Sequence, residues 1–319
     1  LPTATIVQGF DDPSNGKQSQ ILSGVGTGHG NSLVYGGKLI GTASSDYDAG
    51  CNQTKSAWVT PINFSQKSQA SGPYHFNSPV GARWVAGGYL ALVPSEWQSL
   101  LGGKVVSGDG PWSIISCGSP GPTLHVIDAD ALVAQPSAST NINSTPLVYY
   151  EDGTHSSLGL WSSNVCGQVI NGKTVPCITV TDPHGRGNFS FTYEDGTMTV
   201  EGVLFPEGSR SVLFFGKKGM GPHCYGTGGA SGGDCYDPDN SYKGGHAYPY
   251  TEFVWAYDAD DLLAVKNGTK NPWDVLPYTG WAFKVSGDDN GGQRTSVSWD
   301  AATRRAYVVV AHTTSALTP

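Results

Sequence analysis

The feature of this sequence that most constrains its fold is a strand-and-turn unit that occurs twice. At 125–134 and again at 255–264, an apolar run leads into the triplet Asp-Ala-Asp and then into a short helical segment containing leucine. Each copy follows an apolar hairpin, at 81–94 and at 201–216, where β-branched and aromatic residues flank turn-forming residues. This recurrence predicts a fold built from several small antiparallel sheets.

Further hairpins are predicted at 31–43 and 295–311, and the segment 152–193 is expected to hold a fifth, poorly patterned blade. Small sheets repeated with large insertions between them are typical of a β-propeller. We therefore expect an all-β fold, with one β-propeller domain over 1–319 and about five, or six, four-stranded blades. An ordinary β-sandwich is the alternative, because irregular all-β chains carry the same turn signals.

The two ends of the sequence look complementary. An isolated strand is predicted at 3–10, whereas the hairpin at 295–311 has no third strand after it. We expect the N-terminal strand to join this hairpin and close the ring. Two alternatives are that the sequence covers part of a longer chain, or that the strand pairs with a neighbouring molecule and allows self-association.

Composition agrees with a loop-rich all-β protein. Among 319 residues there are 44 glycines and 20 prolines, and only 14% of residues are charged. The net charge of −8 and the lack of a basic stripe argue against nucleic acid or an anionic membrane surface as a partner. No apolar run approaches the roughly 20 residues of a membrane span, so we expect no membrane partner either.

Six cysteines indicate an oxidising compartment. Two pairs bracket short loops and a third pair remains, although six cysteines allow many other connectivities. A zinc site is the competing interpretation, but no Cys-x-x-Cys spacing supports it. We expect the disulfides Cys51–Cys117, Cys166–Cys177 and Cys224–Cys235.

Asn-x-Ser/Thr sequons suggest N-glycosylation. Each is weak evidence alone, since sequons arise by chance in a chain rich in Ser and Thr. The sequence starts without a signal peptide, and in a secreted chain this start would be a processed end. We therefore expect a secreted, extracellular glycoprotein, with candidate glycosylation sites at Asn52, Asn63, Asn143, Asn188 and Asn267.

Several short motifs resemble those of an uncharacterised family of secreted proteins that look like β-propellers. They are Val-Pro-Ser-Glu-Trp at 93–97, Cys-Tyr-Gly at 224–226 with Cys-Tyr-Asp-Pro at 235–238, His-Ala-Tyr-Pro-Tyr at 246–250 and Trp-Ala-Tyr-Asp at 255–258. The resemblance covers most of the chain beyond residue 31. It implies the propeller architecture and brings no known activity or catalytic residues.

Propeller geometry proposes where a binding site would lie. In each blade, the loop that enters the innermost strand and the loop between the second and third strands open on the same face. Applied to the predicted blades, this rule gathers acids, bases and aromatic side chains on one rim: His29, Asp46, Asp48, Arg83, Glu96, Trp97, Glu201, Lys217, His223, Tyr225, Arg294 and His312.

This rim could cleave glycosidic bonds in two ways. Hydrolysis needs two carboxyl groups, one that protonates the leaving oxygen and one that activates water or attacks the sugar. A lyase would instead neutralise a uronate with a cation and use a base and an acid. The predicted catalytic residues are therefore Asp46, Asp48, Glu201 and His223, and the predicted substrate-binding residues are His29, Arg83, Trp97, Tyr225 and Arg294.

Simpler structural roles compete with these assignments. Arg83 and Arg294 could pair with acids in the central channel. The Asp-Ala-Asp turns could cap their helical segments, with calcium binding as the alternative; we otherwise expect no cofactor and no metal. His223 could brace a disulfide loop, and His125 lies on an apolar strand, as expected for a core histidine with satisfied hydrogen bonds.

The functional expectation is a secreted propeller that engages carbohydrate, as a glycoside hydrolase or polysaccharide lyase. The alternative is a non-catalytic protein, either a lectin-like binder or a structural subunit of an extracellular assembly or filament.

Overall fold

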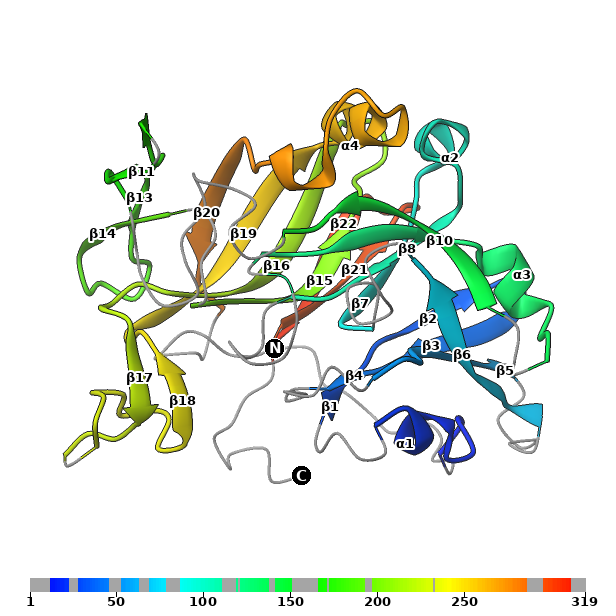
Figure 1. The fold of residues 1–319 in the computed structure, drawn as a ribbon, viewed down its shortest axis with the longest axis horizontal. Coiled ribbons are helices and arrows are strands. Elements are labelled where there is room, and N and C mark those ends of the chain that lie inside the picture. The colour runs from blue at the N-terminus through cyan, green and yellow to red at the C-terminus, as the bar shows by residue number, and fades with distance from the viewer. Residues whose placement is uncertain are drawn as a thin grey trace.

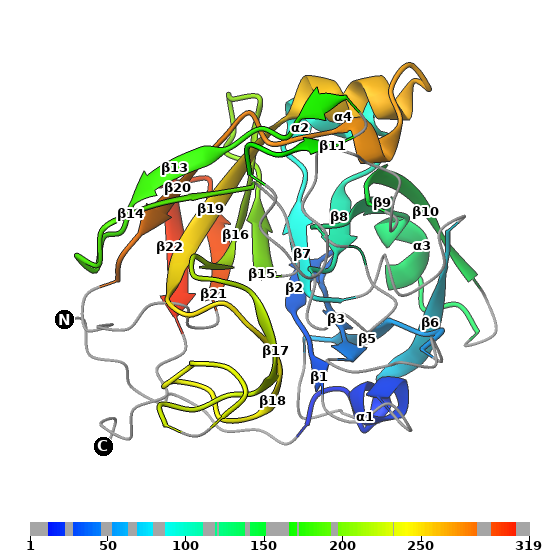
Figure 2. The same ribbon diagram turned by 60° about the vertical axis from the view of Figure 1, so that its left-hand side comes forward.

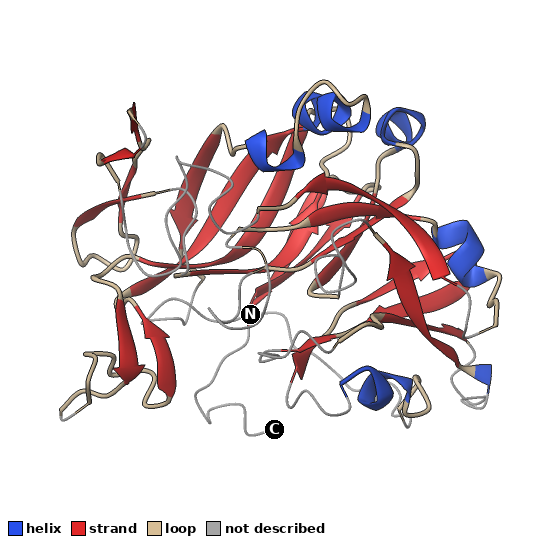
Figure 3. Ribbon diagram, viewed as in Figure 1, coloured by secondary structure: helices blue, strands red, loops and turns tan. Residues whose placement is uncertain are grey.

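The computed structural model is built mainly from β-strands, with a few short helices at its edges (Figures 1 and 3). The mostly β class predicted from the sequence is confirmed. None of the described helices is long and apolar enough to cross a membrane. The residues described are 12–22, 28–45, 53–62, 69–78, 87–110, 119, 121–137, 141–150, 166–170, 172–192, 197–231, 233–285 and 295–310.

The larger sheet has eight strands in the order β2-β3-β5-β6-β10-β9-β8-β7. It consists of two antiparallel meanders joined by parallel pairing of β6 with β10, with Asn141 opposite His75. Because β2 at one edge also contacts β7 at the other, the sheet is a nearly closed barrel. Its strands are β2 (Ser32–Tyr35), β3 (Lys38–Thr42), β5 (Ala57–Pro61), β6 (Ser71–Asn77), β7 (Tyr89–Leu92), β8 (Val105–Gly108), β9 (Leu124–Ile127) and β10 (Asn141–Val148).

The second sheet is antiparallel, in the order β15-β16-β19-β20, and the hairpin β21–β22 packs against β15 (Figure 2). Its strands are β15 (Met198–Leu204), β16 (Ser211–Gly219), β19 (Tyr250–Asp258) and β20 (Thr279–Phe283), and the hairpin strands are β21 (Thr295–Asp300) and β22 (Arg305–Val310). Shorter pairs are β1 (Gly28–His29) with β4 (Ser44–Ser45), β11 (Val169–Ile170) with β12 (Lys173–Thr174), β13 (Ile178–Thr181) with β14 (Asn188–Phe191), and β17 (Cys224–Thr227) with β18 (Lys243–His246).

Short helices follow several strands. They are α1 (Lys17–Leu22), α2 (Ser95–Leu101), α3 (Ala129–Val133), α4 (Ala259–Lys266) and the 3-10 turn η3 (Pro272–Asp274). The helices α2 and α4 contact each other along one edge of the molecule (Figure 1). α3 and α4 each begin within one of the two Asp-Ala-Asp triplets, whose first Asp is the N-cap, so the repeated unit in the sequence is a repeated structural unit.

Aromatic side chains join the two sheets into one hydrophobic cluster. Alternate residues of a strand point to the same face, and on β16 and β19 the residues of one face are fully buried. The ring of Phe214 packs edge to face on Tyr257 at 5.0 Å, and on Tyr89 of the larger sheet at 5.9 Å. This contact fixes β7 against β16.

The predicted hairpins are partly confirmed. Those at 31–43, 201–216 and 295–311 form β2–β3, β15–β16 and β21–β22. Of the hairpin predicted at 81–94, residues 81–86 lie outside the described residues, and the described strand β7 pairs with β8 across the helix α2. Gly102 ends that helix in a left-handed conformation, with φ of 85°, and turns the chain back. The N-cap position of this helix is Pro94, which makes no side-chain capping hydrogen bond.

The described strands do not establish the predicted propeller. Pairing of β6 with β10 merges two four-stranded units into one sheet, whereas propeller blades are separate sheets. The predicted closing strand at 3–10 lies outside the described residues. Within the weakly patterned segment 152–193, the described residues form the hairpins β11–β12 and β13–β14.

Candidate functional site

The predicted rim residues do not assemble into a described site. Asp46, Asp48, Arg83 and Arg294 lie outside the described residues, as does the side chain of His29. The cysteines Cys51 and Cys117 and the sequons at Asn52 and Asn63 also lie outside them. The predicted carboxylate pair of a hydrolase is therefore represented only by Glu201.

Glu201 and Trp97 are both enclosed by the fold. Glu201 occupies an irregularity in β15, where the register with β16 shifts between Val200 and Gly202, and it is 9% exposed. Trp97 is 7% exposed, and its indole Nε1 donates a hydrogen bond to the Ser209 carbonyl at 3.1 Å. It packs α2 against the turn between β15 and β16, and its predicted role in substrate binding stays a prediction.

His223 and Tyr225 lie at the base of a projecting arm, formed by β17, β18 and the loop between them (Figure 1). The predicted disulfide Cys224–Cys235 is confirmed within this arm, and Cys166–Cys177 is confirmed elsewhere. Tyr225 is 48% exposed on β17. His223 and Tyr225 are thus positioned by an arm with two paired strands, in a segment that the sequence predicted to be a loop.

The arm is held by a buried hydrogen-bonded cluster. His246 Nδ1 lies 2.8 Å from Asp237 Oδ2, and the Tyr250 hydroxyl donates to the same oxygen at 2.8 Å. The other ring nitrogen of His246 faces the carbonyl oxygens of Tyr242 and Gly226 at 3.0 and 3.2 Å. Burial, together with the Asp237 carboxylate, raises the pKa of Tyr250. Because His246 and Asp237 are enclosed, we assign this cluster a structural role.

A second buried cluster ties the turn between β13 and β14 to β19. Arg186 Nε donates to Asp182 Oδ2 at 2.6 Å and its Nη2 donates to the Tyr250 carbonyl at 2.5 Å. His184 Nε2 lies 3.3 Å from Glu252 Oε2. Burial alone would raise the pKa of Asp182, but Arg186 and two backbone N–H groups bring it below its ordinary value. These contacts also connect elements of the fold.

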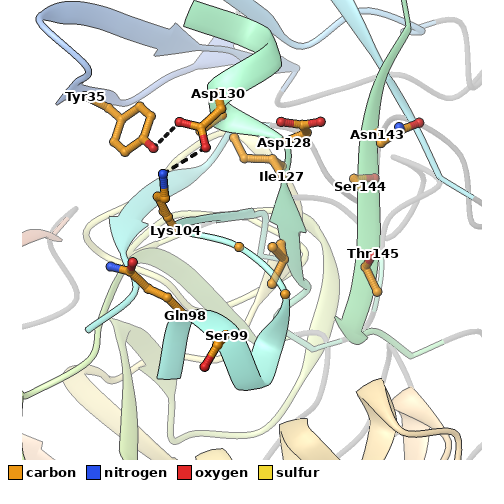
Figure 4. Close-up of a pocket in the computed structure, with 14 residues that line it drawn as sticks. Tyr35, Gln98, Ser99, Lys104, Ile127, Asp128, Asp130, Asn143, Ser144 and Thr145 are labelled. Atoms are coloured by element: carbon orange, nitrogen blue, oxygen red, sulfur yellow. Dashed lines mark hydrogen bonds and ion pairs between the residues drawn. The ribbon is translucent and has the colours of Figure 1, made fainter. Parts of the chain in front are cut away.

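The open site is a polar groove of about 560 Å³ at the edge of the larger sheet (Figure 4). Its floor is β9, one wall is the turn from α2 to β8, and the other wall is β10, with the start of α3 at one end. The volume is within the range of small-molecule sites. Its polar side chains come from Tyr35, Gln98, Ser99, Lys104, Asp128, Asp130, Asn143, Ser144 and Thr145.

The first Asp-Ala-Asp triplet supplies the acidic end of the groove. Asp128 Oδ1 accepts a hydrogen bond from the Ala131 N–H at 2.9 Å, which confirms the predicted cap. The second triplet is also a cap, since Asp258 Oδ1 accepts from the Asp260 N–H at 3.0 Å. In the first triplet, Asp128 thus caps the helix and Asp130 lines the groove.

Asp130 is the centre of an exposed charged network (Figure 4). Lys104 Nζ donates to Asp130 Oδ2 at 2.9 Å, and the Tyr35 hydroxyl donates to Oδ1 at 2.5 Å. The hydrogen bond from Tyr35, followed by that from Lys104, lowers the pKa of Asp130. Asp130 in turn raises the pKa of Lys104, and partial burial, together with Asp130, raises the pKa of Tyr35. At neutral pH the groove therefore presents a carboxylate beside an ammonium group.

The opposite wall is formed by Asn143, Ser144 and Thr145 of β10 (Figure 4). The Asn143 carbonyl accepts from the Asp128 N–H at 2.9 Å, which fixes this wall against the start of α3. The Asp-Ala-Asp triplet and the Asn-Ser-Thr sequon are both visible in the sequence, where they predict a helix cap and a glycosylation site. The groove could not be predicted from them, because nothing in the sequence shows that the two segments lie side by side.

This arrangement suits binding of a polyhydroxylated ligand. Carboxylates accept hydrogen bonds from sugar hydroxyls, while the ammonium, amide and hydroxyl groups donate to them. Among the described residues, no group of three or more His, Cys, Asp or Glu side chains is arranged to hold a metal ion. Comparisons with protein-family models, curated proteins and solved structures gave no significant match, so no relative assigns a role to the groove.

Proposed function

We propose that this protein is a secreted, extracellular carbohydrate-binding protein that binds sugar in the groove without cleaving it. The observation that carries this proposal is the convergence of Asp128, Asp130, Lys104 and Asn143 on one open groove of about 560 Å³. Two carboxylates and one ammonium group lie among these residues. The ligand is therefore a neutral sugar or an amino sugar, since a uronate would be repelled by the excess negative charge.

Binding is favoured over hydrolysis by the acid–base properties of the groove. A glycosidase needs a carboxyl group whose pKa is raised, so that it can protonate the leaving oxygen. The pKa of Asp130 is lowered, and its oxygens already accept hydrogen bonds from Tyr35 and Lys104. Asp130 is thus suited to accept hydrogen bonds from a bound sugar and poorly suited to donate a proton.

Two observations support the extracellular part of the proposal. The disulfides Cys166–Cys177 and Cys224–Cys235 are compatible with an oxidising compartment. The asparagines of the three described sequons, Asn143, Asn188 and Asn267, are all exposed, as a glycosylation acceptor must be.

The proposed architecture is a propeller in which two blades have merged at their outer edges. In support of this, the first strands of the successive units, β2, β7, β15 and β21, contact one another in sequence order. In a propeller, the first strands of the blades surround the central axis. An experimental structure would test this proposal by showing whether the strand predicted at 3–10 completes the hairpin β21–β22.

The function is tested by a glycan array followed by calorimetry with the purified protein. We expect a neutral or amino sugar to bind, and Asp130→Asn to weaken binding by about tenfold, because a hydrogen bond to a charged group contributes roughly 1.5–3 kcal/mol. Asp260→Asn is the matched control, since Asp260 occupies the same position in the second triplet and pairs with Arg210 outside the groove.

Assays for new reducing ends and for unsaturated products accompany the binding measurement. New reducing ends would indicate a hydrolase, and unsaturated products would indicate a lyase. Absence of any glycan binding, or equal losses in the two variants, would refute the groove as a sugar site.

A further inference from the structure

A second cavity adjoins the groove. It has a volume of about 420 Å³ and lies between β2, β7, β15 and β21, where the first strands of the four units meet. Much of its lining is apolar and includes Leu33, Leu92, Leu204, Val297 and Trp299. Apolar residues thus form a larger part of its lining than of the groove's, alongside polar residues such as Glu207 and Ser296.

The two cavities adjoin each other, because Tyr35, Gln98 and Lys104 line both of them. A ligand that passes these side chains would reach from one cavity into the other. Hydrogen bonds to the backbone of Val93 hold two of these shared residues in place. Gln98 Nε2 donates to the Val93 carbonyl at 2.8 Å, and the Val93 N–H donates to the Lys104 carbonyl at 2.9 Å.

Leu92 provides an apolar contact surface in the second cavity. The three preceding residues of β7 are buried, whereas Leu92 is 51% exposed. Covering such a side chain removes apolar surface from water and stabilises a complex by about 25 cal/mol per Å². A purely polar sugar would leave this surface uncovered.

We infer that the ligand is amphipathic, a sugar that carries an apolar aglycone. This inference rests on the proposed function. The sugar lies in the groove against Asp128, Asp130 and Asn143, and the aglycone passes Tyr35, Gln98 and Lys104 to enter the apolar cavity. A glycolipid and a free alkyl or aryl glycoside share this chemistry.

The test is a homologous series of n-alkyl β-glucosides and β-maltosides, from methyl to octyl, measured by calorimetry below the micelle concentration. Each methylene group that enters the cavity contributes about 0.8 kcal/mol, so the dissociation constant should fall about threefold to fourfold per methylene. An octyl chain on an oligo(ethylene glycol) head has the tail without the sugar, and it should bind far more weakly than octyl glycoside.

Two matched variants locate the tail. Leu92→Ser should flatten the dependence on chain length and leave the affinity for the methyl glycoside unchanged. Val34→Ser is the control, because Val34 is 54% exposed on β2 but does not line the cavity. Since both side chains are exposed, both variants should keep the thermal stability of the parent protein.

The outcomes separate this inference from the proposed function. If methyl glycosides bind, Asp130→Asn weakens them and chain length has no effect, the sugar site stands and the inference is refuted. If long-chain glycosides bind equally well to Asp130→Asn, or if the octyl chain without sugar binds equally well, both are refuted. With the chain-length dependence established, binding to vesicles containing a glycosylceramide would indicate a glycolipid, and binding to soluble glycosides alone would indicate a free glycoside.

Discussion

Lys104 Nζ lies 2.9 Å from Asp130 Oδ2, and this ion pair connects the turn after α2 with the first turn of α3. Both side chains are largely exposed, at 49% and 64%, so we expect the pair to contribute little to folding stability. Its effect is on the groove, where it holds a carboxylate and an ammonium group at fixed positions.

Sugar binding should therefore depend on pH through Asp130. The pKa of this group is lowered, so the carboxylate persists as the pH falls to its ordinary value of 3.8 and is lost only below it. We expect constant affinity from pH 7 to about pH 4, followed by a decline. Calorimetry across this range checks the prediction, with circular dichroism to verify that the protein stays folded. Asp130→Asn should lack the acidic decline, and a decline centred near pH 6 would contradict this assignment.

Folding stability should depend on pH through His125. This residue of β9 is fully buried, and within the described part of the chain neither ring nitrogen has a hydrogen-bond partner. The position of His125 in the core was predicted correctly from the sequence, but the prediction that its hydrogen bonds are satisfied was wrong. Burial lowers the pKa of His125 from 6.5 to about 3, so the unfolded chain takes up a proton at a pH where the folded chain does not.

The contribution of His125 to stability is consequently present above pH 6.5 and is lost as the pH falls from 6.5 towards 3. The slope from this group is about 1.4 kcal/mol per pH unit. Urea unfolding at several pH values should show that His125→Leu, which keeps an apolar side chain at this position, has a shallower slope than the parent protein. An unchanged slope would assign the acid sensitivity to other groups.

Arg186→Met should destabilise the fold, because it leaves the enclosed carboxylate of Asp182 without its charged partner at 2.6 Å. We expect a loss of about 2 kcal/mol in the free energy of unfolding at pH 7. The loss should shrink as the pH falls below 3.8 and through the lowered pKa of Asp182 in the parent protein, because below that pKa the carboxyl group is neutral in both proteins. Arg210→Met is the control, since Arg210 is 65% exposed in its pairs with Asp258 and Asp260, and it should change stability little. Equal losses in the two variants would contradict a special role for the enclosed pair.

Glycosylation of Asn143 should block the groove. Asn143 is exposed and lines the groove, and an attached N-glycan is bulky compared with a space of about 560 Å³. Protein made in a host without N-glycosylation should bind sugar, whereas protein with an occupied Asn143, identified by mass spectrometry, should not. Asn188→Gln and Asn267→Gln serve as controls that should leave binding unchanged. Full binding by protein glycosylated at Asn143 would show that the ligand lies elsewhere.

Much of the local structure could be predicted because its determinants are close together in the chain. The turn at 206–209 between two apolar strands specified the hairpin β15–β16, and the spacing of Asp128 from Ala131 specified a cap. Cys224 and Cys235 are only 11 residues apart, so their disulfide could also be predicted. Where a helix intervened, as between β7 and β8, the same reasoning did not predict the pairing.

The sequence by itself thus determined the mostly β class, three hairpins, two helix caps and two disulfides, since each depends on neighbouring residues and on alternating side chains. The tertiary structure alone decided that β6 pairs with β10, that Trp97 is buried, and that Tyr35, Lys104 and Asp130 meet. These contacts join segments brought together by the packing of whole sheets, and packing depends on the shape and volume of many side chains at once. Such contacts cannot be predicted from a local pattern of residues, so the groove could be identified only from the folded chain.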